Sequence, residues 1–142
     1  MKLGLKGRRA LVTGGTRGIG RAIAFALAAE GVDVGICARD AAAVTATVAE
    51  LKATGVRADG RALDVADATA LKTWVTETAQ GFGGLDILVA NTSAMAEGAT
   101  ETEFRKAFEV DVLHTLNAVT AAMPFLETSG GGSIVAISSI SG

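Results

Sequence analysis

Residues 13–20 have the sequence TGGTRGIG and lie between a short apolar run at residues 10–12 and a segment with helical character. A strand, a glycine-rich turn and a helix in this order form a phosphate-binding arrangement. The spacing of Gly14, Gly18 and Gly20 suits a sharp turn, close approach of a diphosphate to the backbone, and close packing of the helix, in that order. Because the first-turn N–H groups of a helix lack intrahelical partners, they favour an anion.

The order of these glycines, Gly-x-x-x-Gly-x-Gly, differs from the Gly-x-Gly-x-x-Gly of the commonest dinucleotide fingerprint. A P-loop of the NTPase type is disfavoured because no Lys-Ser or Lys-Thr pair follows. Taken alone, the glycine pattern is compatible with a dinucleotide site and equally with an ordinary tight turn between a strand and a helix. The rest of the chain decides between these two interpretations.

Length and composition indicate one α/β domain. With 142 residues, 49% of them hydrophobic, and 18 glycines, the chain can bury parallel strands under closely packed helices. The net charge of −2, without a basic cluster, argues against nucleic acid as a partner. No apolar run approaches the length of a membrane span or of a signal peptide, so we expect a soluble, cytoplasmic protein without a membrane partner. Cys37, the single cysteine, is expected to be buried and unpaired.

Five apolar runs predict strands, and they alternate with four segments of helical spacing. The strands are expected at residues 10–12, 32–38, 61–65, 86–90 and 133–137, and the helices at residues 21–30, 40–55, 67–82 and 100–126. Asp40 and Asp67 stand where each could cap the amino terminus of its helix. This alternation predicts a Rossmann-type doubly wound parallel sheet with strand order 3-2-1-4-5, in which the crossover lies next to the glycine turn.

A set of mostly polar residues follows the carboxyl ends of these predicted strands, where open α/β sheets bind ligands. They are Arg39, Asp64, Val65, Asn91 and the pair Ser138-Ser139. Together with the TGGTRGIG segment, their order and spacing resemble the short-chain dehydrogenase/reductase family, particularly NADP-preferring members such as carbonyl and 3-oxoacyl reductases. The resemblance extends over every predicted element and favours the dinucleotide interpretation of the glycine turn.

The resemblance also implies a role for each matching residue. Contacts with the cofactor are expected from Gly14, Thr16, Arg17, Gly18, Ile19, Gly20, Arg39, Asp64, Val65 and Asn91. Of these, Asp64 and Val65 match residues that contact the adenine ring, and Ser139 matches a serine that polarises the substrate carbonyl. The implied activity is hydride transfer between a nicotinamide cofactor and a carbonyl or secondary alcohol. The implied partner is a small-molecule substrate, and no metal is expected.

Cofactor preference depends on the residues at the end of the second predicted strand. Family members that prefer NAD carry an acidic residue at the position of Ala38, and this chain has none there. Arg17 and Arg39 instead provide two guanidinium groups for a 2′-phosphate. NADP(H) is therefore the expected cofactor, with NAD less favoured. The alternative is that both arginines are ordinary surface side chains.

Three departures from the family pattern concern the reaction itself. At the end of the fourth predicted strand the chain has Ala90-Asn91-Thr92-Ser93, where the family has Asn-Asn-Ala-Gly, so one asparagine is retained and the glycine is lost. Asp111 stands at the position of a catalytic asparagine. Asp111 could still hold a relay water, although its charge adds a negative potential near the site. The third departure is the largest, because the chain contains no tyrosine and so lacks the family's Tyr-x-x-x-Lys proton donor.

Residues 1–142 are therefore expected to be a Rossmann dinucleotide-binding domain, truncated before the segment that carries the tyrosine. We expect the intact protein to be an NADP-dependent oxidoreductase and the 142 residues alone to be inactive. Two alternatives remain, namely a cofactor-binding module without catalytic activity and an interaction fragment. His114, near Asp111, is expected to be a packing or surface residue and not a substitute acid.

The predicted helix at residues 100–126 carries two apolar stripes. The stronger stripe is expected to cover the sheet and consists of Phe104, Phe108, Val112, Leu116, Val119 and Met123. The weaker stripe is expected to pair with the same helix of a second subunit and consists of Ala107, Val110, Leu113 and Ala121. Pairing around a two-fold axis is what the family resemblance implies, so a homo-oligomer is expected. The alternative is that a further part of the same subunit covers this face.

Overall fold

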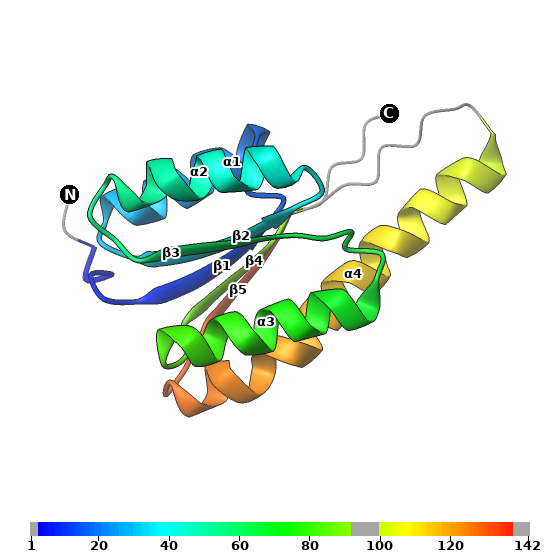
Figure 1. Ribbon diagram of the computed structural model, residues 1–142. Helices are drawn as coiled ribbons and strands as arrows, with labels where there is room; N and C mark the ends of the chain where they lie inside the picture. Colours follow the sequence, from blue (N-terminus) through cyan, green and yellow to red (C-terminus); the bar gives the residue numbers. More distant parts are fainter. Residues whose placement is uncertain (1–2, 92–99, 138–142) are drawn as a thin grey trace.

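The computed structural model describes residues 3–91 and 100–137, which form nine helices and strands of an α/β fold. In chain order they are β1 (Arg9–Thr13), α1 (Gly18–Ala29), β2 (Asp33–Ala38), α2 (Ala41–Lys52), β3 (Ala58–Ala62), α3 (Ala68–Phe82), β4 (Ile87–Ala90), α4 (Glu101–Thr128) and β5 (Ser133–Ala136). Neighbouring strands pair in parallel in the order β3-β2-β1-β4-β5, which confirms the predicted topology. Helices α1 and α2 cover one face of the sheet, and α3 and α4 lie on the other (Figure 1).

One strand lies away from its predicted position. β3 spans Ala58–Ala62, whereas the sequence predicts a strand at residues 61–65. The strand ends early because Asp64 turns the chain, since its Oδ1 accepts a hydrogen bond from the N–H of Ala66 at 2.9 Å. Leu63, which suggested a strand, is buried in the core on the α3 side of the sheet.

The core has two layers, one on each face of the sheet. Alternate residues of β1 point to opposite layers: Leu11 packs with residues of α3 and α4, whereas Ala10 and Val12 pack with residues of α1 and α2. The buried face of α3 consists of Leu71, Trp74, Val75, Thr78, Ala79 and Phe82. Cover on both faces explains why the central strands are apolar throughout.

Side chains cap three of the helices. Asp40, Asp67 and Thr100 precede α2, α3 and α4, and each accepts a hydrogen bond from a first-turn N–H at a distance between 3.0 and 3.3 Å. The predicted caps at Asp40 and Asp67 are therefore confirmed. Arg17, the residue before α1, makes no such hydrogen bond among the described residues. The amino terminus of α1 is thus left without a side-chain cap.

Helix α4 does not cover the sheet with its stronger apolar stripe, so that expectation was wrong. Phe104, Phe108, Val112 and Leu116 are between 49% and 58% exposed, and Met123 is 36% exposed. Of the six residues in that stripe, Val119 alone packs partly against the core. The amino-terminal half of α4 projects beyond the other elements (Figure 1), and its large apolar side chains therefore have no part of the sheet beneath them.

The buried face of α4 consists of His114, Ala118, Ala122 and Leu126, which are spaced four residues apart along one side of the helix. Ala118 and Ala122 are fully buried, and their small side chains let the helix approach the sheet and α3 closely. In the weaker predicted stripe, Ala121 packs partly against the core, while Leu113 is 54% exposed. The packed face of α4 is therefore selected by shape and not by the size of its apolar side chains.

β5 forms one edge of the sheet, and all four of its residues are exposed. It pairs with β4 on one side, from Ile87↔Ser133 to Ala90↔Ala136. Within the described ranges, no strand pairs with its other side. In the same part of the chain, no helix is both long and apolar enough to cross a lipid bilayer.

Candidate functional site

The TGGTRGIG segment forms the turn from β1 into α1, at the crossover point of the sheet. Gly14 and Gly18 have φ angles of +64° and +58°, a left-handed conformation that only glycine adopts without strain. At Gly20 a Cβ atom would lie 2.1 Å from the Gly14 carbonyl oxygen and 2.3 Å from Nδ2 of Asn91. The tight turn and the close packing expected of these glycines are therefore both present in the geometry.

The amino terminus of α1 has the features of an anion site. Its first turn contains no acidic side chain and, within the described residues, no side chain caps it. The first-turn N–H groups are thus available to a ligand at the positive end of the helix dipole. Thr16 is half-buried, Arg17 is exposed and Ile19 is 59% exposed, so this turn presents polar, cationic and apolar atoms together. These features fit the diphosphate of a dinucleotide cofactor.

Thr13 and Asn91 join the carboxyl ends of β1 and β4. The backbone N–H of Asn91 donates to Oγ1 of Thr13 at 2.8 Å. The side-chain Nδ2 of Asn91 lies 3.5 Å from the Thr13 carbonyl oxygen and 3.4 Å from that of Gly14. The structure thus places Asn91 against the glycine turn. Thr13 was not predicted as a site residue, although a polar side chain at the end of an apolar buried strand is a usable signal.

Arg39 and Asp64 meet beyond the ends of β2 and β3. Nη2 of Arg39 donates to Oδ2 of Asp64 at 3.0 Å, while the other carboxylate oxygen accepts from the backbone of Ala66. Their side chains are 80% and 48% exposed, so the ion pair contributes at most about 1 kcal/mol. Val65 is half-buried and packs partly against the core. Asp40 caps α2 and so directs its carboxylate to its own helix and not to Arg39.

Asp111 and His114 lie one turn apart on α4. His114 is 2% exposed, and its Nε2 is 3.0 Å from Oγ1 of Thr13. Burial lowers the pKa of His114 below its usual value, and the negative charge of Asp111 acts in the opposite direction. The structure confirms His114 as a packing residue, and it also places the imidazole against the glycine turn. The line of small side chains at Ala118 and Ala122 is the sequence signal that could have identified this buried face.

Cys37 lies at the end of β2 and is fully buried. Burial raises the pKa of its thiol to about 12, although a backbone hydrogen bond from Gly14 lowers it in part. The thiol is therefore protonated and unreactive at neutral pH. This confirms the prediction that Cys37 is a small buried hydrophobe.

Ser139 lies outside the described residues, as do Ser138 and the pair Thr92-Ser93, so their roles stay predictions. Among residues 3–91 and 100–137, no three side chains of cysteine, histidine, aspartate or glutamate are arranged to hold a metal ion. The described candidate site thus consists of the glycine turn, the ends of β1 to β4, and the inward face of α4.

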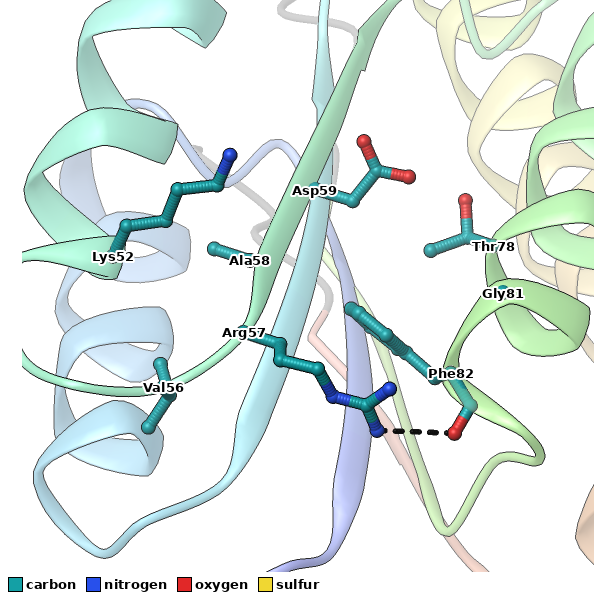
Figure 2. A pocket seen from close by; sticks show the side chains of 8 residues that line it. All are labelled: Lys52, Val56, Arg57, Ala58, Asp59, Thr78, Gly81 and Phe82. Carbon is teal, nitrogen blue, oxygen red and sulfur yellow. Dashed lines mark hydrogen bonds between the residues drawn. The ribbon is translucent and has the colours of Figure 1, made fainter.

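A separate groove of about 470 Å³ lies beside the start of β3, between α2 and α3 (Figure 2). Arg57 lies in its lining, and its Nη2 donates to the carbonyl oxygen of Phe82 at 3.1 Å. Nε of Arg57 also donates to Asp33 at 2.9 Å, so the guanidinium group is engaged in holding β2, β3 and α3 together. The groove lies at the amino ends of the strands, away from the glycine turn, and none of the predicted site residues lines it.

Comparison with known proteins places the chain in a family. Residues 8–142 match the family described as short chain dehydrogenase. Isoepoxydon dehydrogenase of Penicillium expansum is 39% identical over 145 residues, which cover 98% of this chain and 55% of that protein. The 3-oxoacyl-[acyl-carrier-protein] reductase of Staphylococcus aureus is 34% identical, with 95% and 57% covered. The chain therefore spans about half the length of the curated relatives it matches.

Solved structures of similar proteins share the fold. A short chain dehydrogenase of Burkholderia cenocepacia in complex with NADP has 41% identity and a TM-score of 0.80, covering 93% of this chain and 55% of that one. A short chain dehydrogenase of Mycobacterium paratuberculosis bound to NAD has 33% identity and a TM-score of 0.86, covering 95% and 56%. The sheet order, the glycine turn and the match over residues 8–142 together show that this chain belongs to the short-chain dehydrogenase family.

Proposed function

We propose that residues 1–142 form the NADP(H)-binding domain of a cytoplasmic oxidoreductase that interconverts a carbonyl and a secondary alcohol. The observation that carries this proposal is the uncapped amino terminus of α1, which begins at Gly18, where a Cβ atom would meet only open space. Arg17 and Arg39 would bind the 2′-phosphate, Asp64 and Val65 the adenine ring, and Asn91 the nicotinamide half. Relatives named as dehydrogenases and reductases support the reaction class.

The preference for NADP(H) rests on the charge at the end of β2. Ala38 places no carboxylate there, and Arg39 is highly exposed. The exposed pair of Arg39 with Asp64 is worth at most about 1 kcal/mol, whereas a charge-assisted contact with a phosphate contributes about 1.5–3 kcal/mol. We therefore expect Arg39 to exchange Asp64 for the 2′-phosphate. The NADP complex of the Burkholderia relative supports this preference, and the NAD complex of the Mycobacterium relative supports the alternative.

A bound nicotinamide supplies the hydride in this chemistry. We propose that Ser139 donates a hydrogen bond to the carbonyl oxygen, where negative charge develops, and that Asp111 holds a water molecule on the path of the proton. The chain contains no tyrosine, and a positioned acid is typically worth about 10²–10⁴ in rate, so we expect no turnover from residues 1–142 alone. Carbonyl reduction by these purified residues, if Ser139→Ala abolishes it, would contradict that expectation.

The cofactor proposal is tested with the double substitution Ala38→Asp and Arg39→Ala. The new carboxylate suits ribose hydroxyl groups and repels a phosphate, so we expect NADPH to bind about tenfold more weakly, or worse, and NADH to bind more tightly. Dissociation constants for both nucleotides can be measured by fluorescence titration. The matched control is Arg105→Ala, which removes an equally charged and similarly exposed side chain from α4.

The same titration separates two ways in which the proposal could fail. If the unsubstituted protein binds NADH more tightly than NADPH, the preference for NADP(H) is wrong, but the dinucleotide site stands. If it binds neither nucleotide, the dinucleotide site itself is wrong. A change in preference caused by Arg105→Ala would show that general charge, and not Arg39, controls binding.

We also propose that a second copy of the chain covers the exposed row of α4. The partner surface that we propose is the exposed row of Phe104, Phe108, Val112 and Leu116, and it differs from the weaker stripe expected from the sequence. Exposed apolar patches of this kind mark partner sites, and a two-fold pair of helices would bury the same row on both copies.

The assembly is tested by placing charges in this row with Val112→Glu and Leu116→Lys. We expect smaller particles in light scattering and a lower melting temperature, because the row would no longer exclude water from a helix pair. The control exchanges two exposed charges on the same helix, Lys106→Glu with Glu109→Lys, and should change neither quantity. Unchanged size and melting temperature in the first variant would show that α4 is not the interface.

A further inference from the structure

His114 is a buried titratable side chain that the proposed reaction does not use. It is the only histidine in the chain and is 2% exposed on the inward face of α4. Its Nε2 lies 3.0 Å from Oγ1 of Thr13, a residue 101 positions earlier in the chain. Because a buried imidazole is costly without a hydrogen bond, this contact restricts how α4 lies against the end of β1.

The hydroxyl group of Thr13 can donate one proton and accept at two lone pairs. It accepts from the backbone N–H of Asn91 at 2.8 Å. Its own proton has two neighbouring acceptors, Nε2 of His114 at 3.0 Å and the carbonyl oxygen of Val89 at 3.5 Å. The contact with His114 is the shorter of the two, which favours a neutral imidazole that accepts at Nε2 and carries its proton on Nδ1. Burial, which lowers the pKa of His114, favours the same form, whereas the charge of Asp111 opposes it.

The chain of hydrogen bonds continues from Thr13 into the glycine turn. The side chain of Asn91 reaches the carbonyl oxygens of Thr13 and Gly14, and it also packs against Gly20 with no space for a Cβ atom. A movement of the Thr13 hydroxyl would therefore move Asn91 and the turn together. The imidazole of His114 thus supports the positions of Asn91 and the glycine turn through the Thr13 hydroxyl group.

Building on the proposed dinucleotide site, we propose that His114 is a positioning residue of that site. Through the hydroxyl group of Thr13, it holds Asn91 and the glycine turn in the geometry that binds the diphosphate and the nicotinamide half of the cofactor. Arg39 and Asp64 are joined to each other beyond the ends of β2 and β3 and take no part in this chain of hydrogen bonds. Loss of His114 should therefore weaken binding of the whole dinucleotide and spare binding of its adenine end.

The test uses three variants of the whole protein. His114→Leu keeps an apolar side chain of similar size, and His114→Gln keeps an amide that can reach the Thr13 hydroxyl. Leu126→Ala is the control, because it removes a buried side chain from the far end of the same helix face. Each variant is titrated with NADPH and with adenosine 2′-monophosphate, which carries the adenine and the 2′-phosphate but neither the diphosphate nor the nicotinamide.

We expect His114→Leu to bind NADPH about tenfold more weakly, near the upper limit for one neutral hydrogen bond, and adenosine 2′-monophosphate as before. His114→Gln should recover most of the NADPH affinity. Leu126→Ala should lower the melting temperature without changing either affinity. If His114→Leu does not fold, His114→Asn replaces it, because its shorter amide cannot reach the Thr13 hydroxyl and should show the same loss of NADPH affinity.

Equal NADPH affinity in His114→Leu and the unsubstituted protein would overturn the proposal. So would a parallel loss of both ligands in His114→Leu and Leu126→Ala, since that result indicates general destabilisation. Failure of the proposed dinucleotide site is recognised separately, because the unsubstituted protein would then bind neither ligand.

Discussion

Strands β1 and β5 are both short and apolar, but they lie in opposite environments. Ala10, Leu11 and Val12 of β1 are 0% exposed, whereas Ile134 and Val135 of β5 are 41% and 46% exposed. β1 lies between β2 and β4 with helices on both faces, while β5 forms an edge of the sheet (Figure 1). Apolar side chains make burial favourable, and the neighbouring elements decide whether it is complete.

The two proposed functions, cofactor binding and assembly, are likewise divided between buried central elements and an exposed element. Thr13 and Asn91 of the candidate cofactor site stand at the ends of central strands, where hydrogen bonds and packing hold them. The proposed assembly row of α4 lies in the projecting part of the molecule, where large apolar side chains are exposed. Rigid central elements suit a site that needs fixed geometry, and exposed apolar elements suit a partner.

The largest expected effect on stability comes from truncating a large aliphatic side chain to alanine, and we compare this change in β1 and in β5. Leu11→Ala should lower the free energy of unfolding by about 2–5 kcal/mol, because the fully buried site leaves a cavity. Ile134→Ala should lower it by about 1 kcal/mol or less, since the side chain is already partly in water. Urea unfolding followed by circular dichroism measures both. Equal losses would show that β5 is covered in solution and that the contrast between the strands is false.

A smaller effect is expected from charged groups, one beside the central strands β1 and β4 and the other on the projecting helix α4. Asp86 is 5% exposed at the start of β4 and accepts hydrogen bonds from the backbone and Nε of Arg9, both at 2.9 Å. Asp86→Asn should therefore lower the free energy of unfolding by about 1.5–3 kcal/mol. Glu101→Gln removes the exposed ion pair with Arg105 on α4 and should cost about 0.5 kcal/mol or less. A cost for Glu101→Gln as large as that for Asp86→Asn would contradict the exposure of the projecting helix.

The smallest effect is expected from protonation of His114. Burial lowers its pKa from the usual 6.5, with Asp111 acting in the opposite direction, so the unfolded chain binds this proton more readily than the folded chain. The stability contributed by the neutral form is complete above pH 6.5 and is lost as the pH falls below that value. Urea unfolding between about pH 7 and pH 5 should show this decline, and His114→Gln should remove it.

Asp86→Asn provides the control, because Asp86 titrates in a different range. Burial raises the pKa of Asp86, but the hydrogen bonds and charge of Arg9, with the charge of Arg8, outweigh burial and lower it from the usual 3.8. Its contribution is present above pH 3.8 and is lost as the pH falls through the lower folded value. Asp86→Asn should therefore reduce stability between about pH 5 and pH 7 without changing its slope. A slope that persists in His114→Gln would show that another group causes the decline.

The parts of the candidate site that were predictable are those that depend on residues near one another in the chain. The spacing of Gly14, Gly18 and Gly20 and the caps at Asp40 and Asp67 are of this kind, because a turn or a first helical turn involves only a few consecutive residues. The contact of His114 with Thr13 joins segments 101 positions apart. No local pattern encodes such a contact, since it requires α4 to pack against the end of β1.

The sequence by itself determined the order of the strands and helices, the parallel sheet with order 3-2-1-4-5, and the location of the glycine turn at its crossover. These follow from hydrophobic periodicity and from the few connections that parallel strands allow. Only the tertiary structure decided which face of α4 is buried and where β3 ends. Those outcomes depend on how closely two surfaces can approach and on which elements lie beside them. On α4, the small side chains of Ala118 and Ala122 are buried, whereas the more hydrophobic Phe104 and Phe108 are exposed. Ile134 is exposed because β5 lies at the edge of the sheet.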